Sequence, residues 1–377
     1  MKLYKIVLIA LLAISCKKEN SIKPDPIADV DYNDHPKQTQ YQAALHTYKV
    51  QTSSPGSILL VSRENERLWI GSDGFSNLEY NTVMRKNHQF RAASITKMFT
   101  SVVIMQFVQE GKLSLDAKLS SFVPNLSKYI DNSSAITIRH LLANLSGIPD
   151  PVNESIEYQT DILNHPEEMA KLSVEAKIKK YLSGKPLKFS PGSEYSYSNT
   201  NFLLLGAIAE ELGGKTLNAL FNERIYTPLG LKNTYLEIRD DKNVSRSYAD
   251  IFQNGQVMDV TLFDKAEGDA EADGGLITTA EDLFLFMKGL FNGQLVSPLL
   301  VNEMKRKQLS SCNSTECEYG LGIEIWRTGA GIAYGHNGSL LGVEANTLFY
   351  PDKNAIIVLY KNNGNGSDKE FLSELVK

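Results

Sequence analysis

Hydrophobic residues near the two ends of the chain are spaced as in strands, whereas those in the middle are spaced mainly as in helices. After an amphipathic helical segment at 38–50, apolar runs at 57–63 and 67–74 flank a polar turn, a pattern typical of paired strands. Strand-like segments return near the C-terminus, before a last helical segment at 367–377. These C-terminal strand segments are 319–328, 331–339, 344–351 and 355–363.

The middle of the chain begins with a strongly apolar segment at 94–110, followed by Gly111 at the position of a helix C-cap. Nearly every side chain after its first turn is hydrophobic, so we expect this helix to be buried on all sides. Further segments with helical periodicity or caps are 137–148, 173–184, 200–214, 217–230 and 279–293. The Asn-Gly pair at 254–255 predicts a β-hairpin within this region.

This order of elements predicts an α/β protein of the α+β type. Strands from both chain ends would form one antiparallel sheet covered by the terminal helices, with the helical region inserted between them. We assign residues 38–93 and 296–377 to the α/β domain and residues 94–295 to the mainly helical domain, which would carry the helix at 94–110.

The first residues have the pattern of an export signal. Two lysines precede an apolar run of nine residues at 6–14, which is too short to span a bilayer. Ser15 before Cys16 resembles a bacterial lipobox, so we predict a signal peptide at 1–15, lipidation of Cys16 and a polar tether at 16–37. The protein would then be exported and lipid-anchored at the cell envelope. The alternative is an ordinary signal peptide with an incidental cysteine.

Charge and cysteine content narrow the possible partners. The formal net charge is −5 and lysine and arginine form no long run, which argues against a nucleic-acid partner. Cys312 and Cys317 are close in sequence, and an exported protein meets an oxidising compartment, so we predict a local disulfide. Two cysteines would need two further zinc ligands, and the six histidines show no metal spacing. We therefore expect neither a metal nor a cofactor.

The first turn of the helix at 94–110 contains the most unusual polar pair. With Ser94 as the N-cap, Lys97 occupies the third helical position, where a capping box would have Glu or Gln. A cation there opposes the helix dipole, and burial and the dipole would both lower its pKa. A lysine in this state can take the hydroxyl proton of Ser94 and activate it as a nucleophile. The alternative is a simple serine cap with a lysine that extends to solvent.

Two later segments contain groups that fit the same chemistry. Tyr197 and Asn199 are two residues apart before a predicted helix and would face the same side if the chain there is extended. The phenol can relay a proton and the amide can hold a substrate carbonyl, although a turn followed by an asparagine cap explains them equally. His336 lies in a glycine-rich strand-like stretch that suits close approach of a ligand backbone. Here the alternative is a hairpin turn at the Asn-Gly pair 337–338.

Taken together and in this order, Ser94-x-x-Lys97, Tyr197-x-Asn199 and His336-x-Gly338 resemble the motifs of the penicillin-recognising serine hydrolases. This superfamily includes class C β-lactamases, D-alanyl-D-alanine carboxypeptidases and related esterases. The resemblance extends from about residue 57 to 363, and it includes the phrases LLANLSGI, SPGSEYSYSN and GHNGSLLGVEANTLFYPD. It implies the same fold as the residue pattern, with the active site between the sheet and the helical domain.

The resemblance also implies roles for individual residues. Ser94 would be the acylating nucleophile and Lys97 its proton partner, while Tyr197 would act as the base in acylation or activate water in deacylation. Asn199 would hold the substrate amide and Lys97. The backbone N–H groups of Ser94 and Ser339 would form the oxyanion hole.

Two positions depart from the family pattern. The resemblance makes His336 and Gly338 part of the substrate-binding strand. His336 stands where β-lactamases of this class generally have a lysine that helps to bind a substrate carboxylate, and we expect His336 to contact that carboxylate, although a histidine is mostly neutral near pH 7. Asp273 stands where a small residue is commoner. We therefore expect an acyl-enzyme serine hydrolase that acts on peptidoglycan-type D-Ala-D-Ala peptides rather than an efficient β-lactamase. The alternatives are a carboxylesterase or amidase on the same scaffold, or a penicillin- or muropeptide-binding module without turnover.

Overall fold

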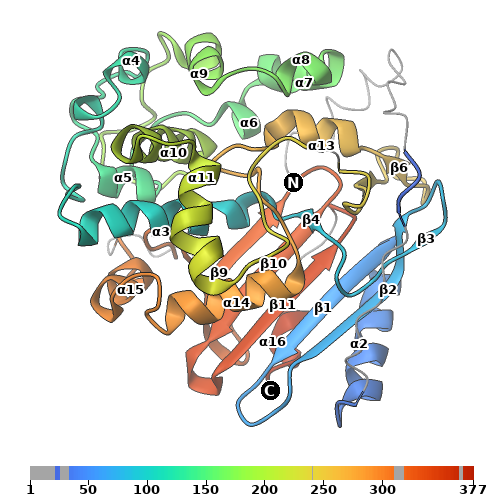
Figure 1. Cartoon of the computed structure of the whole chain (residues 1–377). Helices are drawn as coiled ribbons and strands as arrows, with labels where there is room; N and C mark the ends of the chain where they lie inside the picture. The colour runs from blue at the N-terminus through green and yellow to red at the C-terminus, as the bar shows by residue number, and fades with distance from the viewer. Residues whose placement is uncertain (1–21, 26–33, 240, 310–317, 365–367) are drawn as a thin grey trace.

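The computed structural model describes residues 22–25, 34–239, 241–309, 318–364 and 368–377. Within them, a seven-stranded antiparallel sheet has the order β3-β2-β1-β11-β10-β9-β8 (Figure 1). Its strands are β1 (Gly56–Ser62), β2 (Trp69–Asn77), β3 (Thr82–Val83), β8 (Glu324–Thr328), β9 (Gly331–Ser339), β10 (Glu344–Tyr350) and β11 (Ala355–Lys361). The N-terminal and C-terminal strands therefore share one sheet, as the sequence predicted.

The two ends of the chain meet at the centre of this sheet, where β1 pairs with β11 in the register Leu59↔Leu359. Ile58 and Leu59 are both fully buried although they point to opposite faces of the sheet. Both strands read as continuous hydrophobic runs because helices cover both faces of the sheet.

Different helices cover the two faces. On one face α2 (Gln38–Gln51) and α16 (Lys369–Glu374) pack on the sheet, with Leu45 and Leu372 in a small core beside Leu59. On the other face α14 (Ala280–Phe291) packs against β1, β10 and β11. The core on that side is continuous from the sheet into the helical region, since Ile58 belongs to the same buried cluster as Phe99.

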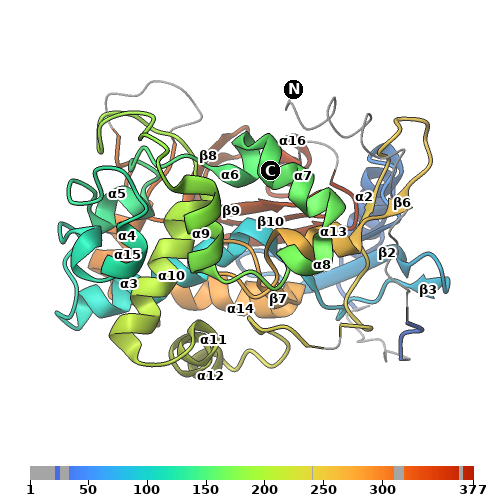
Figure 2. The same ribbon diagram turned by 90° about the horizontal axis from the view of Figure 1, so that it is seen from above.

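The helical region lies above this second face, as Figure 2 shows from a second direction. Its first helix, α3 (Thr96–Gln109), is buried along nearly its whole length and packs against α10 (Asn199–Gly213). The others are α4 (Pro124–Ser127), α5 (Ile138–Leu142), α6 (Pro151–Glu154), α7 (Ile156–Asn164), α8 (Pro166–Met169), α9 (Val174–Leu182), α11 (Leu217–Phe221), α12 (Thr227–Leu229), α13 (Thr261–Gly268) and α15 (Pro298–Lys305).

Short elements complete the described chain. The predicted hairpin forms between β5 (Tyr248–Ala249) and β6 (Met258–Asp259), and β4 (Phe90–Arg91) pairs with β7 (Ile277–Thr278). Single turns of 3₁₀-helix lie at Ala93–Ile95, Leu119–Ser121 and Pro351–Lys353, and a π-helical turn, Asn222–Tyr226, joins α11 to α12.

Two predicted boundaries differ from the structure. The range 296–377 for the returning α/β domain starts too late, because α14 at 280–291 already packs on the sheet. The tether at 16–37 is predicted too long, since His35 is buried and Lys37 pairs with Glu66 at 2.6 Å. Polarity suggested a free linker, whereas these side chains find partners on the folded body.

Some predictions fall on parts of the chain that are not described. Cys16, Cys312 and Cys317 lie outside the described residues, so the lipid anchor and the disulfide stay predictions. Within the described ranges, no helix has the length and apolar character needed to cross a membrane.

Candidate active site

Ser94 lies on a tight turn that leads into α3. The turn is a 3₁₀-helix, Ala93–Ile95, and α3 itself begins at Thr96. Ser94 is therefore not the N-cap that the sequence suggested, and no side chain caps this end of α3. Ala93 is buried with φ +47°, a backbone conformation that costs a non-glycine residue free energy and is typical of functional sites. The strained turn leaves Ser94 half-buried at the edge of a cavity.

Lys97 is fully buried, and its ammonium group donates hydrogen bonds to three acceptors. Its Nζ donates to Ser94 Oγ at 2.9 Å, to Asn199 Oδ1 at 2.7 Å and to the backbone oxygen of Asp273 at 2.7 Å. Burial lowers the pKa of Lys97 to about 8, against the opposing effect of nearby carboxylates. A lysine extending to solvent is thereby excluded. The residue has the environment of a lysine that can take a proton near neutral pH.

Tyr197 reaches Ser94 from the extended segment just before α10. Ser198 is extended, with φ −146° and ψ 120°, and α10 starts at Asn199, so the two motif residues face the same site as predicted. The Tyr197 O–H donates to Ser94 Oγ at 2.9 Å. Burial holds the pKa of Tyr197 well above its ordinary value, so its phenol keeps its proton near pH 7.

Asn199 links Lys97 to a buried carboxylate that the sequence did not single out. Its Oδ1 accepts from Lys97, and its Nδ2 donates to Asp150 Oδ1 and Oδ2 at 3.3 and 3.2 Å. Burial raises the pKa of Asp150 to about 6. Asp150 follows the recognised LLANLSGI phrase, but nothing in the local pattern showed that it would face Asn199.

The glycines around His336 serve the protein's own packing. A Cβ on Gly338 would lie 2.1 Å from the backbone oxygen of Ala92, so β9 passes directly over the turn before Ser94. A Cβ on Gly335 would lie 1.8 Å from the backbone oxygen of Thr347. The sequence suggested that a ligand backbone approaches here, whereas the close approach is that of neighbouring segments. Ser339, at the end of β9, is exposed and lines the cavity.

His336 does not reach the cavity. It lies inside β9, which also excludes the alternative of a hairpin turn at residues 337–338. Its side chain is fully buried, with Nε2 2.9 Å from the Tyr319 hydroxyl and Nδ1 2.5 Å from the backbone oxygen of Asn337. Burial lowers the pKa of His336. The strand directs Asn337 and Ser339, rather than His336, to the cavity wall, and contact of His336 with a substrate carboxylate stays a prediction.

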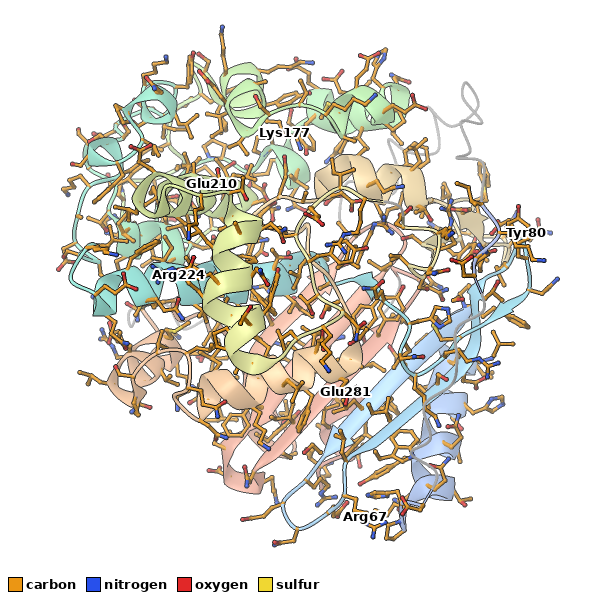
Figure 3. All side chains as sticks on the ribbon, viewed as in Figure 1. Arg67, Tyr80, Lys177, Glu210, Arg224 and Glu281 are labelled. Carbon is orange, nitrogen blue, oxygen red and sulfur yellow. The ribbon has the colours of Figure 1, made fainter. Side chains whose placement is uncertain are left out.

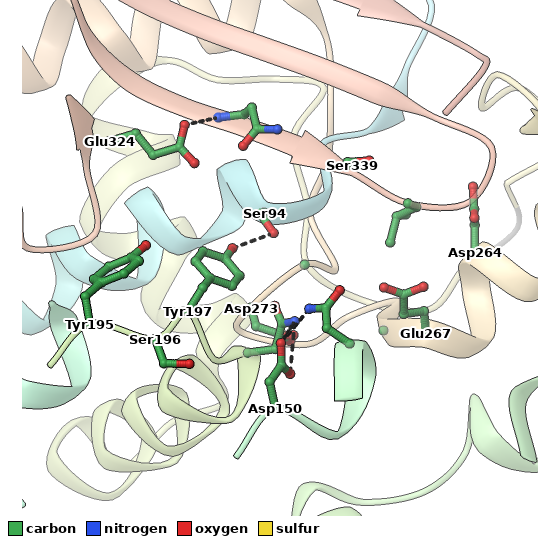
Figure 4. Close-up of a pocket in the computed structure, with 16 residues that line it drawn as sticks. Ser94, Asp150, Tyr195, Ser196, Tyr197, Asp264, Glu267, Asp273, Glu324 and Ser339 are labelled. Atoms are coloured by element: carbon green, nitrogen blue, oxygen red, sulfur yellow. Dashed lines mark hydrogen bonds between the residues drawn. The ribbon is translucent and has the colours of Figure 1, made fainter. Parts of the chain in front are cut away.

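The cavity in front of Ser94 has a volume of about 600 Å³ (Figure 4). Its lining residues are Ser94, Asp150, Asn153, Tyr195, Ser196, Tyr197, Asn199, Asp264, Glu267, Gly268, Asp273, Gly274, Glu324, Asn337, Ser339 and Leu340. Sequence reasoning missed most of its acidic side chains, because they come from four separate elements with no shared motif.

Asp273, noted in the sequence as unusual, belongs to a buried acidic cluster at the wall of the cavity. Its neighbour Glu271 pairs at 2.7 Å with Lys177 of α9, which Figure 3 labels. Burial raises the pKa of Asp273 and raises that of Glu271 to about 7. The described residues contain no group of three or more His, Cys, Asp or Glu arranged to hold a metal ion.

Comparison with known proteins agrees with this geometry. The profile of the β-lactamase family matches residues 39–376, nearly the whole chain. The chain belongs to the β-lactamase family. The predicted resemblance to penicillin-recognising serine hydrolases and the predicted fold are both confirmed.

Named relatives within this family are varied. The esterase EstB of Burkholderia gladioli is 29% identical over 182 residues, which are 47% of this chain and 46% of that protein. The D-aminopeptidase of Brucella anthropi is 25% identical over 334 residues, 84% of this chain and 58% of that protein. The chain thus spans about half the length of these two curated relatives. The crystal structure of a D-stereospecific amidohydrolase from Streptomyces sp. covers 86% of this chain and 96% of its own, with 26% identity and a TM-score of 0.72.

Proposed function

We propose that this protein is a serine hydrolase that cleaves small amides or esters through an acyl-enzyme on Ser94. One observation carries the proposal: Ser94 Oγ lies 2.9 Å from Lys97 Nζ and 2.9 Å from the Tyr197 hydroxyl. A nucleophile within hydrogen-bond reach of a proton acceptor and a proton donor is the arrangement that acyl transfer requires. Membership of the β-lactamase family supports the same chemistry.

Acylation uses the two neighbours of Ser94 in different roles. In its neutral form Lys97 accepts the Ser94 proton as Oγ forms a bond to the substrate carbonyl carbon. The backbone N–H groups of Ser94 and Ser339, both at the cavity, stabilise the oxyanion. As the carbonyl–leaving-group bond breaks, Tyr197, which holds its proton, donates it to the leaving nitrogen or oxygen. The acyl-enzyme then contains a Lys97 ammonium and a Tyr197 phenolate.

Deacylation reverses these transfers. Water attacks the acyl carbon and gives its proton to the Tyr197 phenolate, while Ser94 Oγ recovers a proton from Lys97 as the acyl bond breaks. Both groups return to their starting state and no cofactor is consumed. Of the two roles that the sequence left open for Tyr197, its raised pKa favours activation of water in deacylation over action as the base in acylation.

Two substrate classes fit this chemistry. D-Ala-D-Ala peptides of the peptidoglycan type, cut as by a carboxypeptidase, were the first prediction, and lipidation of Cys16 would place the protein where such peptides occur. An amidase or esterase is the second candidate, and one observation favours it: His336, the group expected to bind a terminal carboxylate, is buried away from the cavity. The names of the relatives, an esterase, a D-aminopeptidase and a D-stereospecific amidohydrolase, fit this second candidate.

Mass spectrometry with p-nitrophenyl acetate tests the proposal. We expect an acetyl adduct on Ser94 during turnover, and neither adduct nor turnover in Ser94→Ala with an unchanged circular dichroism spectrum. Steady hydrolysis by Ser94→Ala would refute the nucleophile. Stoichiometric labelling without turnover would favour a binding module instead.

A further inference from the structure

The cavity wall is strongly acidic. Five of its lining residues carry a carboxyl group, and none of the described lining residues is a lysine, arginine or histidine. The five are Asp150, then Asp264 and Glu267 on α13, Asp273 soon after that helix, and Glu324 at the start of β8. Figure 4 shows Glu324 on one side of Ser94 and Glu267 with Asp264 on the other. Acidic groups therefore flank the nucleophile on two sides.

These carboxyl groups differ in the hydrogen bonds that they accept from the protein and in their pKa. Asp150 accepts from Asn199 and Asn153, and burial raises the pKa of Asp264 to about 7. Glu324 accepts from the backbone N–H of Asn337 and the indole of Trp326 through one oxygen, Oε2. Its other oxygen, Oε1, lies 3.6 Å from Nδ1 of the buried His336.

Glu267 lies near the end of α13 and is half-buried at the cavity wall. Glu267 and Glu324 are thus the two carboxyl groups that combine partial exposure with a place in the wall of the cavity that contains Ser94.

The cation nearest the nucleophile is buried out of a ligand's reach, and the carboxyl groups that act on it outnumber it. Lys97 lies behind Ser94, is fully buried and gives hydrogen bonds to three protein acceptors. Glu267 and Glu324 both act electrostatically on Lys97, together with Asp273 and Asp150. An approaching ligand group therefore meets a negative potential, focused by the low-dielectric walls of the cavity.

We propose that the cavity selects acyl donors that carry a cationic group, such as a free ammonium next to the scissile carbonyl, and disfavours donors with a carboxylate there. Amino-acid amides and peptides with an unblocked N-terminal residue have this chemistry. Their ammonium would lie against Glu267 or Glu324, where opposite charge is complementary. This inference rests on the proposed acyl-enzyme chemistry at Ser94 and narrows it to one substrate class.

Two matched substrates test the selection. Alanine p-nitroanilide and N-acetyl-alanine p-nitroanilide share the scissile bond and differ in the charge of the amine, which is mostly protonated near pH 7. Both enantiomers are assayed with the full chain at low ionic strength. We expect kcat/KM to be at least about tenfold higher for the free amine, with the advantage shrinking as salt screens the charges. Equal values, or a preference for the acetylated substrate, would overturn the proposal.

Charge-neutralising variants test the residues. In Glu267→Gln or Glu324→Gln the ratio of the two kcat/KM values should fall at least about threefold, whichever carboxylate the ammonium contacts. Glu64→Gln is the control, because it removes the same charge from the exposed turn between β1 and β2 and should leave the ratio unchanged. A ratio unchanged in both cavity variants, or lowered equally by Glu64→Gln, would refute local recognition.

The p-nitrophenyl acetate assay distinguishes failure of the proposed ammonium site from failure of the proposed acyl-enzyme chemistry. This neutral ester reports on Ser94 chemistry without an amine. Acetylation of Ser94 with no preference for the free amine rejects only the ammonium site, whereas failure to acylate Ser94 rejects the proposed function itself.

Discussion

Lys97 Nζ lies 2.7 Å from Asn199 Oδ1, so a neutral amide rather than a carboxylate orients the buried lysine of this site. A carboxylate in that place would stabilise the ammonium and raise the pKa of Lys97. The amide holds the lysine in position without adding a negative charge. This choice keeps the pKa near 8, where burial has placed it.

The variant Asn199→Asp should therefore shift the pH dependence of the reaction. Since acylation uses neutral Lys97, kcat/KM for a neutral ester should rise with pH and level off above about 8 in the unmodified protein. The added carboxylate should shift this rising limb of the pH profile to higher pH, by about one pH unit or more. Stopped-flow or steady-state pH profiles measure the shift. Asn65→Asp, which adds the same charge at an exposed turn, should leave the limb in place, and an unmoved limb in Asn199→Asp would contradict the role of Lys97.

Removing the phenol of Tyr197 should affect amides more than activated esters. Tyr197→Phe deletes the proton donor for the leaving group, and general acid–base groups contribute about 10²–10⁴-fold. An anilide or peptide amine needs that proton to leave, whereas p-nitrophenolate does not. We expect acylation to fall by about 10²-fold or more for an alanine anilide and by much less for p-nitrophenyl acetate. Equal losses in single-turnover acylation would argue against proton donation, and Tyr80→Phe, on an exposed tyrosine, serves as the control.

Gly338→Ala should damage both stability and activity, although it adds only a methyl group. The new Cβ would lie 2.1 Å from the backbone oxygen of Ala92 and 3.0 Å from the Cβ of Ala93, so β9 must move away from the turn that carries Ser94. Overpacking of this kind costs about 1–3 kcal/mol of unfolding free energy. Denaturant titration measures that loss. Gly274→Ala is the matched control, since its nearest neighbour would be 4.0 Å away, and a comparable loss there would remove the explanation.

His336 should influence stability at low pH rather than recognition of anionic substrates. Its pKa is lowered by burial, so the folded state binds its proton less readily than the unfolded state does. The stability that neutral His336 contributes is present above the unfolded pKa of about 6.5 and is lost as the pH falls through that value toward the lower folded pKa.

The variant His336→Gln tests this linkage. Between about pH 6.5 and 5, the slope of unfolding free energy against pH should be smaller in the variant, by at most about 1.4 kcal/mol per pH unit. His88, whose pKa burial lowers to about 4, contributes to the same range in both proteins and cancels in the difference. Parallel slopes would contradict the linkage, and a selective loss of kcat/KM for anionic substrates would support the predicted substrate contact instead.

The periodicity of the chain predicted the fold well because long, buried elements dominate it. The apolar spacing of α3 and of the strands near both chain ends follows directly from burial on one or both faces. The residue pattern alone was therefore enough to predict that these strands share one sheet. The domain boundaries were predicted less well where packing partners decide to which domain an element belongs. α14 has the pattern of any amphipathic helix, and nothing in its sequence says that it lies on the sheet rather than among the helices.

The site was predicted in part, and the missed parts have two causes. Ser94, Lys97, Tyr197 and Asn199 stand in short motifs, and the structure brings all four together. The burial of His336 was not predicted, because a strand alternates its side chains and the sequence did not show which face meets the cavity. The acidic wall was missed for a different reason: Glu267 and Glu324 become neighbours of Ser94 only through the tertiary fold.

The pairing of β1 with β11 also has a consequence for how the protein matures. Leu59 meets Leu359 at the centre of the sheet, so the contact closes almost the longest loop that the chain can form. Such non-local pairing is slow, and it must wait until the last strand has been synthesised. The helix that carries Ser94 packs on a core continuous with that sheet. Nascent chains that end before residue 355 would therefore contain Ser94 but lack a finished site, which delays any hydrolytic activity until β11 has been synthesised.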